Sequence, residues 1–245
     1  MTSDPLVRFV LTGRFAHFAQ AASQLTILSY PLPPRTVLLG LAGAVLGLAK
    51  DTAPAILEPA HIAVGGPIPS SHWHRALLRK TSPEYLPSNP DEWLEHHKAR
   101  NAKEEQTRVL QEWLVAPRYT VWMRLPAPYQ EEFAQRLIQR HWHFTPYLGI
   151  SEMLADLQEA TLLPLHPLPF GHHNVQSLIS QDQGTVSEAA LLQSDYALRI
   201  QTLPRTVTTD RCFTHARYIV EASGRPITVE TDAAYQAGDD VVMFL

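Results

Sequence analysis

The sequence predicts an α+β protein in which a ferredoxin-like antiparallel sheet carries helices on one face. Three observations predict it: residues 6–12 alternate as a strand does, a nearly uncharged helix follows near residues 35–50, and a second short strand is expected at 61–65. Together with the later elements they give the order β-α-β, insertion, β-β-α-β. That order fits a ferredoxin-like sandwich better than a doubly wound sheet.

The first strand is expected to have one core-facing side and one partly polar side. In LVRFVLT (6–12), Val7, Phe9 and Leu11 share one face, and Gly13 ends the strand. Residues 28–47 then read LSYPLPPRTVLLGLAGAVLG.

The prolines of that segment hold the backbone extended, because a residue before proline avoids the helical region. Pro34 can occupy a first helical turn without losing a hydrogen bond. The helix behind it is apolar almost all round, so we expect it to be buried on most sides. Its glycines, Gly40, Gly43 and Gly47, are interpreted as positions of close packing.

An insertion is expected at about 67–115. Its stretch from Pro69 to Thr107 is dominated by polar and charged residues, and we expect it to be part helix and part mobile arm. Strands are predicted at 108–114 and 118–125.

The remaining elements are a helix within 128–142, a tight element with a short helix at 147–157, and several C-terminal strands. These strands are expected near 196–201, at 213–221 and at 227–230, with a turn at Gly224-Arg225. The predicted division is a ferredoxin-like domain at 1–165, containing the insertion, and a β-rich extension at 166–245.

Composition sets limits on function. The 245 residues include 20 Lys and Arg against 24 Asp and Glu, a net charge of −4, so nothing global indicates nucleic acid, although a local basic groove remains compatible. The single cysteine, Cys212, excludes an internal disulfide framework.

The N-terminus lacks a signal-peptide pattern, and the apolar run at 37–49 is shorter than the roughly 20 residues of a membrane span. These two features predict a cytoplasmic protein without membrane contact.

Motifs for metal binding and covalent catalysis are missing. Eight of the twelve histidines fall in adjacent or alternate pairs, none with the i, i+4 spacing of a zinc protease: His72/His74, His96/His97, His141/His143 and His172/His173. There is no G-x-S-x-G motif and no phosphate loop. We therefore predict no metal, no cofactor and no catalytic residue.

Cations and aromatic residues occur together in two places. Residues 72–80 read HWHRALLRK, and residues 14–18 combine an arginine, a histidine and a phenylalanine. Arg35 adds a cation at a helix N-terminus, which favours anions. Cations for phosphates and aromatic rings for bases are the usual means of binding single-stranded nucleic acid. An ordinary solvated face is the alternative for each cluster.

Three joined motifs resemble the N-terminus of the CRISPR-associated Cas-five family. They are G-x-F-A-x-F (13–18), S-Y-P-x-P-P-R-T (29–36) and G-L-x-G-A-x-L-G (40–47), and Y-L-G-x-S-E (147–152) is similar to a later element of that family. The resemblance covers residues 6–65 strongly and 108–157 loosely, and it looks most like the type I-B branch.

The resemblance implies a repeat-associated (RAMP) protein with a protruding thumb, part of the type I effector complex Cascade. It implies a non-catalytic subunit that caps the 5′ handle of the CRISPR RNA, contacts the backbone and large subunits, and lies near target DNA. The residues expected to bind RNA are Arg14, His17, Phe18, Tyr30, Arg35, Trp73, Arg75, Arg79 and Lys80.

Two other functions stay open. In the type I-C branch a tyrosine and a Lys-His pair cut precursor RNA without metal, whereas this chain has only the reversed His97-Lys98. A small-molecule enzyme that uses the histidines and Tyr30 is the second alternative.

Overall fold

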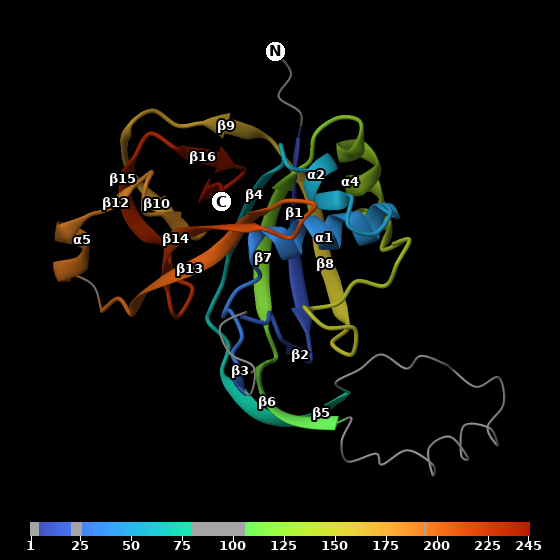
Figure 1. Cartoon of the computed structure of the whole chain (residues 1–245). Helices are drawn as coiled ribbons and strands as arrows, with labels where there is room; N and C mark the ends of the chain where they lie inside the picture. The colour runs from blue at the N-terminus through green and yellow to red at the C-terminus, as the bar shows by residue number, and fades with distance from the viewer. Residues whose placement is uncertain (1–4, 21–25, 80–105, 194) are drawn as a thin grey trace, which may run out of the picture.

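The computed structural model describes residues 5–20, 26–79, 106–193 and 195–245. Its centre is a four-stranded antiparallel sheet of order β4-β7-β1-β8, shown in Figure 1. The strands are β1 (Leu6–Gly13), β4 (His61–Gly65), β7 (Arg118–Arg124) and β8 (Ala155–Leu163). In the chain they follow the order β1-α1-β4-β7-α4-β8, so the α+β prediction and the positions of its first strands are confirmed.

The apolar helix α1 (Arg35–Leu46) is covered on two sides. Val7, Phe9 and Leu11 of β1 lie in one cluster with Leu38 and Leu41 of the helix, and residues of two later strands close over it. This double cover explains the helix that is apolar nearly all round. It ends earlier than predicted, because Gly47 takes a left-handed φ of 78° and its N–H bonds the Gly43 carbonyl.

Two further helices complete this side. The short α2 (Ala53–Ile56) packs so closely on α1 that a Cβ at Gly43 would lie 2.5 Å from the Ala53 Cβ. Helix α4 (Tyr129–Gln139) contributes Phe133 and Leu137 to the core beside β1.

The opposite face of the central sheet is covered by C-terminal strands rather than by solvent. The sheet β17-β16-β9 consists of β9 (Leu165–Pro167), β16 (Ala234–Ala237) and β17 (Asp240–Met243). Leu6 and Trp122 of the central sheet pack against Val242 of this layer. The Asp240 carboxylate accepts hydrogen bonds from Arg8 Nε at 3.2 Å and Trp122 Nε1 at 3.0 Å, which ties the layers together.

The rest of the C-terminal third forms two more small sheets and one helix. One sheet has the order β10-β15-β12, and the other the order β11-β14-β13. Their members are β10 (Gly171–Val175), β11 (Ile179–Ser180), β12 (Thr185–Val186), α5 (Glu188–Gln193), β13 (Leu198–Val207), β14 (Phe213–Glu221) and β15 (Ile227–Thr231). Strands β13, β14 and β15 confirm the three predicted there, whereas β9 to β12, β16 and β17 were not predicted.

The insertion is a β-hairpin where the structure describes it. Strand β5 (Ser71–Arg79) pairs antiparallel with β6 (Gln106–Val115), and β6 also pairs with β2 (Phe15–Ala16) and β3 (Thr26–Ile27). The helix and mobile arm expected between Pro69 and Thr107 are therefore wrong for residues 71–79, and the remainder, 80–105, lies outside the described residues.

The short helix predicted within 147–157 is also wrong. The chain makes a bridge between Tyr147 and Leu154, and β8 begins at Ala155. Gly149 has a φ of 95°, and its Cα lies so close to the His17 carbonyl that no side chain fits there. Docking against the chain near His17 fixes this bend and excludes the helix.

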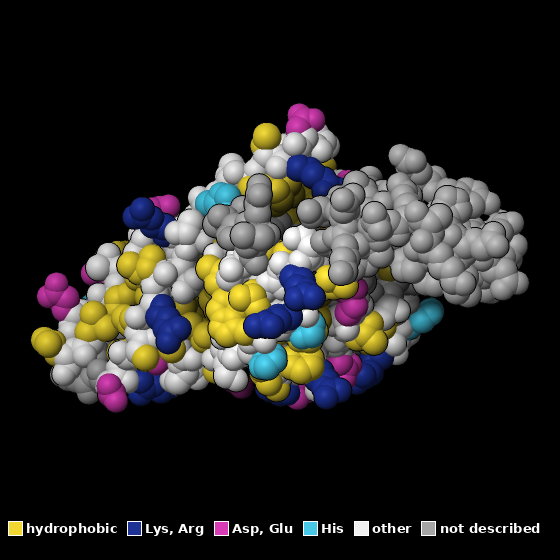
Figure 2. Space-filling view, turned by 60° about the horizontal axis from the view of Figure 1, so that its bottom comes forward, with side chains coloured by type: hydrophobic (Ala, Val, Ile, Leu, Met, Phe, Trp, Pro, Cys, Tyr) yellow, Lys and Arg dark blue, Asp and Glu magenta, His cyan; other side chains and the backbone are white. Residues whose placement is uncertain are grey.

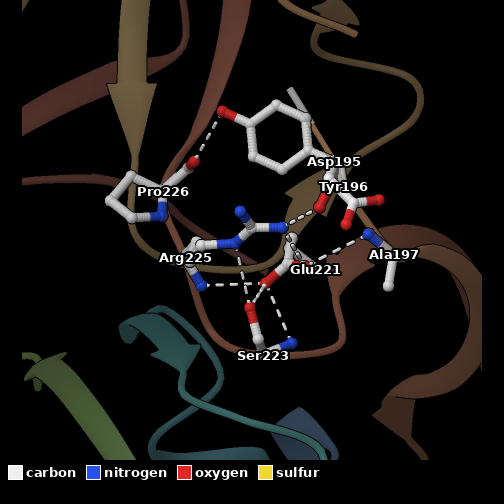
Figure 3. A network of polar contacts seen from close by, with 7 residues as sticks. All are labelled: Asp195, Tyr196, Ala197, Glu221, Ser223, Arg225 and Pro226. Atoms are coloured by element: carbon white, nitrogen blue, oxygen red, sulfur yellow. Dashed lines mark hydrogen bonds and ion pairs between the residues drawn. The ribbon is translucent and has the colours of Figure 1, made fainter. Parts of the chain in front are cut away.

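A buried carboxylate organises the turn after β14 (Figure 3). Glu221 accepts hydrogen bonds from the backbone N–H groups of Ala197, Ser223 and Arg225 and from the Ser223 hydroxyl, and Arg225 forms an ion pair with it. Burial alone raises the pKa of Glu221, but these hydrogen bonds outweigh burial and lower the pKa to about 2. The carboxylate holds the turn in place.

We predict that Leu41→Ala lowers the free energy of unfolding by about 2–5 kcal/mol, because Leu41 is enclosed between the sheet and its helix neighbours. Urea denaturation followed by circular dichroism measures this change. The exposed Leu192→Ala is the control, and a loss at Leu41 no larger than the control contradicts the described core.

We predict that Glu221→Gln lowers the free energy of unfolding at neutral pH by about 2 kcal/mol, because an amide group then faces hydrogen-bond donors. The folded pKa of about 2 lies below the ordinary 4.5, so the native carboxylate stabilises fully above pH 4.5 and less as pH falls toward 2. Denaturation across that range measures the loss, which the variant should lack. An equal effect of the exposed control Glu230→Gln would argue against it.

Candidate nucleic-acid interface

The outer face of the β5–β6 hairpin carries an aromatic ring and two arginines. The cross-strand pairs on this face are Trp73 with Glu112, Arg75 with Leu110, and Leu77 with Arg108. The exposed fractions of Trp73, Leu77 and Leu110 are 48%, 58% and 38%, large values for apolar side chains. This face is therefore the main candidate for a ligand surface.

The inner face of the hairpin is held to the body by a series of rings. His74 of β5 stacks on Trp113 of β6 with ring centroids 3.8 Å apart, and Trp113 lies 5.4 Å from Phe15. The exposed Arg14 guanidinium lies over the Phe15 ring at 5.5 Å. Stacking and the cation–π contact thus position the hairpin and place Arg14 beside it.

The charge distribution singles out this region. Among the described side chains, the arginines with a carboxylate partner are Arg8, Arg35, Arg118, Arg136, Arg140, Arg211 and Arg225. Those for which the described part of the chain offers no carboxylate are Arg14, Arg75, Arg108, Arg124, Arg199, Arg205 and Arg217. Three of these unpaired arginines belong to the hairpin or to the stack beneath it.

Figure 2 shows this end of the molecule, where Lys, Arg and His side chains gather around a hydrophobic patch. Unpaired cations attract phosphate because no carboxylate competes for them, and exposed rings can stack on bases. The hairpin thus combines both components on one described surface.

Two of the predicted RNA-binding residues lie inside the molecule. His17 is 1% exposed, and its Nδ1 lies 2.8 Å from the Glu112 carbonyl oxygen. Phe18 is 2% exposed and packs near Tyr119. Both side chains fix the base of the hairpin against the central sheet, so neither is placed to contact RNA.

Arg35 is also buried, with 5% of its surface exposed. Its guanidinium donates to the carbonyl oxygens of Glu58, Ala60 and Arg205, and lies 3.8 Å from the Glu58 carboxylate. Burial lowers its pKa, partly offset by Glu58. Arg35 joins the start of α1 to the chain before β4 and to β13, which is a structural role rather than the predicted one.

The remaining predicted residues divide as follows. Arg14, Trp73 and Arg75 are exposed; Trp73 and Arg75 share the outer face of the hairpin, and Arg14 lies over Phe15 in the stack at the inner face. Tyr30 is half-buried against the core, and burial raises its pKa. Arg79 ends β5, and Lys80 lies outside the described residues.

The sequence interpretation did not include Arg108, Leu77 or Leu110 in the site. Arg108 was predicted to begin a strand, and that strand pairs with residues 71–79. Because a long stretch of chain separates the two strands, local sequence patterns do not reveal this pairing. The alternation of RVLQEW (108–113) was the available signal.

The described part of the chain contains no group of three His, Cys, Asp or Glu residues that could hold a metal ion. No helix in the same residues has the length and hydrophobicity needed to cross a membrane.

Comparison with solved structures gives the fold's relatives. A chain of a CRISPR RNA-guided surveillance complex matches with a TM-score of 0.52 at 17% identity, over 92% of this chain and 91% of its own. A CRISPR protein from Archaeoglobus fulgidus matches with a TM-score of 0.52 at 14% identity, over 98% of each chain. This chain has the fold of CRISPR proteins.

The CRISPR fold covers nearly the whole chain in both comparisons, including the C-terminal sheets. No family model and no curated protein sequence matches the chain. The comparison of structures thus finds the shared fold at sequence identities of 17% and 14%.

Proposed function

We propose that this chain is a non-catalytic RNA-binding subunit of a type I CRISPR effector complex, and that its β5–β6 hairpin contacts the 5′ handle of the CRISPR RNA. The observation that carries the proposal is the exposed Trp73 on the same hairpin face as Arg75 and Arg108, two arginines with no carboxylate partner among the described residues. The CRISPR fold supports it, since one protein with that fold is a chain of an RNA-guided surveillance complex.

The chemistry of the hairpin suits single-stranded RNA. Arg75, Arg108 and Arg14 would neutralise phosphates, while the Trp73 ring would stack on a base. Leu110, which lies opposite Arg75, and Leu77, the next residue of β5 on this face, offer apolar contact on the same face. These contacts do not depend on the identity of a base. They would bind the RNA backbone, and other groups would have to recognise its sequence.

The finer parts of the proposal extend the sequence resemblance. The domain at 1–165 is a ferredoxin-like RAMP domain of the Cas-five family, most like the type I-B branch, and the insertion that contains the hairpin is its thumb. The partners are the backbone and large subunits, with target DNA near the complex, in the prokaryotic cytoplasm.

The alternative functions receive less support. Burial raises the pKa of Tyr30, which disfavours the phenolate that an RNA-cleaving tyrosine would need. For a small-molecule enzyme, the cavity of about 700 Å³ beside α4 contains Glu131 as its one ionisable lining residue. Neither place gathers an acid and a base around a common centre.

We predict that Trp73→Ala weakens binding of the CRISPR RNA handle by roughly ten-fold with an unchanged salt dependence, because a stacked base contributes about 1–3 kcal/mol. Arg75→Ala and Arg108→Ala should each reduce the log–log salt slope by about 0.7. Filter binding of the complex assembled with its partner subunits, at several salt concentrations, measures both quantities.

The matched control is Arg118→Ala, an exposed arginine that is paired with Glu159. If the hairpin variants retain RNA as the control does, the hairpin is not the handle site.

We predict that the isolated protein leaves precursor CRISPR RNA uncut, with or without a divalent metal, because no Lys-His pair accompanies a tyrosine. Incubation with end-labelled precursor and denaturing gel analysis measures this. Specific cutting at the handle that is abolished by Tyr30→Ala or His97→Ala would establish the endoribonuclease instead.

A further inference from the structure

A second group of unpaired cations lies on the β13–β14 ribbon, away from the hairpin. Arg199, Arg205 and Arg217 have no carboxylate partner in the described part of the chain, and His215 is exposed beside them. In residues 198–221 the acidic residues are Asp210, in the turn, and the buried Glu221. The ribbon is therefore basic in a chain whose net charge is −4.

One face of β14 presents an aromatic ring followed by a histidine and an arginine. Phe213, His215 and Arg217 are separated by two residues each, so they lie on the same face, and all three are exposed. Successive side chains on this face are about 6–7 Å apart. On the paired strand β13, Pro204 lies opposite His215 and Thr202 lies opposite Arg217. Arg205 follows directly after Pro204.

The ring borders a cavity. A cavity of about 270 Å³ lies between the ribbon tip, the turn at residues 208–212, and the helices α1 and α2. It is lined by Phe213, Val37, Pro54 and the hydroxyl-bearing Thr36, Thr208 and Thr209. Pockets for drug-sized ligands measure roughly 300–1,000 Å³, so this one suits a single planar ring system.

The tip is held in shape by its own hydrogen bonds. The Thr208 and Cys212 backbones are joined at 3.0 Å, the Thr208 hydroxyl accepts from the Cys212 N–H, and the Arg211 N–H bonds the Thr208 carbonyl. Phe213, the next residue, is 50% exposed and borders the cavity, directly after this hydrogen-bonded turn.

Arg211 supplies a further cation at the cavity. It pairs with Asp51 at 3.3 Å, and the two side chains are 70% and 62% exposed. Ion pairs this exposed contribute little to stability, so the guanidinium can exchange Asp51 for a phosphate at little cost.

We propose that the β13–β14 ribbon is a second contact site for single-stranded nucleic acid, with one base stacked on Phe213 in the cavity and the phosphodiester backbone running along His215 and Arg217. An acidic peptide is the other class of ligand for a basic ribbon. The exposed Phe213 ring beside a base-sized cavity favours a nucleic acid, because a base can stack on an aromatic ring whereas the carboxylate of an acidic peptide cannot.

The ribbon tip lies over α1 and α2, whereas the β5–β6 hairpin lies at the other end of the central sheet (Figure 1). The two sites are therefore separate, and this one stands without the proposed function.

The test uses the full-length chain with fluorescent oligouridylate, oligothymidylate and poly-glutamate as probes, at low salt, read by fluorescence anisotropy. Each variant is made in the native chain and in a Trp73→Ala, Arg75→Ala background, so that failure of the hairpin site leaves this site measurable. Phe170→Ala, another exposed phenylalanine outside the ribbon, is the control.

We expect Phe213→Ala to weaken oligonucleotide binding roughly ten-fold in both backgrounds. Arg217→Ala should reduce the salt slope by about 0.7. Tighter binding of oligouridylate would identify the bound strand as RNA, and tighter binding of oligothymidylate would identify it as DNA.

Three results would overturn the proposal. One is Phe213→Ala binding as the Phe170→Ala control does, and a second is no oligonucleotide binding in either background. The third is poly-glutamate binding that depends on the ribbon while oligonucleotide binding does not, which would assign the ribbon to an acidic protein partner.

Discussion

Burial of β1 on both of its faces is the constraint on which the rest of the structure depends. On one side Val7, Phe9 and Leu11 pack against α1, and on the other Leu6 packs under the C-terminal strands. Strand β2 follows one residue after the end of β1, and its Phe15 is the first ring of the stack that holds the hairpin. The core and the candidate interface are thus joined by one short stretch of chain.

This arrangement explains which parts of the fold the sequence could predict. The alternation at residues 6–12, the apolar helix behind the prolines and the strand at 61–65 are local patterns whose cause is burial by neighbouring layers, and all three are confirmed. The C-terminal strands β9, β16 and β17 carry weaker patterns, because they are short and are ordered by packing on Leu6 and Trp122. The bend at Gly149 depends on contact with a strand-end residue far away in the chain, so a local helical pattern was misleading there.

The candidate site was predicted in part for a similar reason. Arg14, Trp73 and Arg75 are exposed, as a binding role requires, whereas Phe18 and Arg35 match a binding motif by residue type but are buried. Residue type does not distinguish a cation that binds a ligand from one that binds backbone carbonyls, as Arg35 does. The three-dimensional contacts make the distinction: Arg35 is buried on backbone carbonyls, whereas Arg75 and Arg108 are exposed with no carboxylate partner among the described residues.

The central claim is that the β5–β6 hairpin contacts the 5′ handle of a CRISPR RNA. The most direct measurement is ultraviolet crosslinking of the complex isolated with its native RNA, followed by sequencing of the RNA and mass spectrometry of the crosslinked peptides. The account predicts RNA that begins with a repeat-derived handle, crosslinked to peptides from residues 71–79 or 106–115. Bound RNA unrelated to the repeat, or handle crosslinks confined to other parts of the chain, would contradict it.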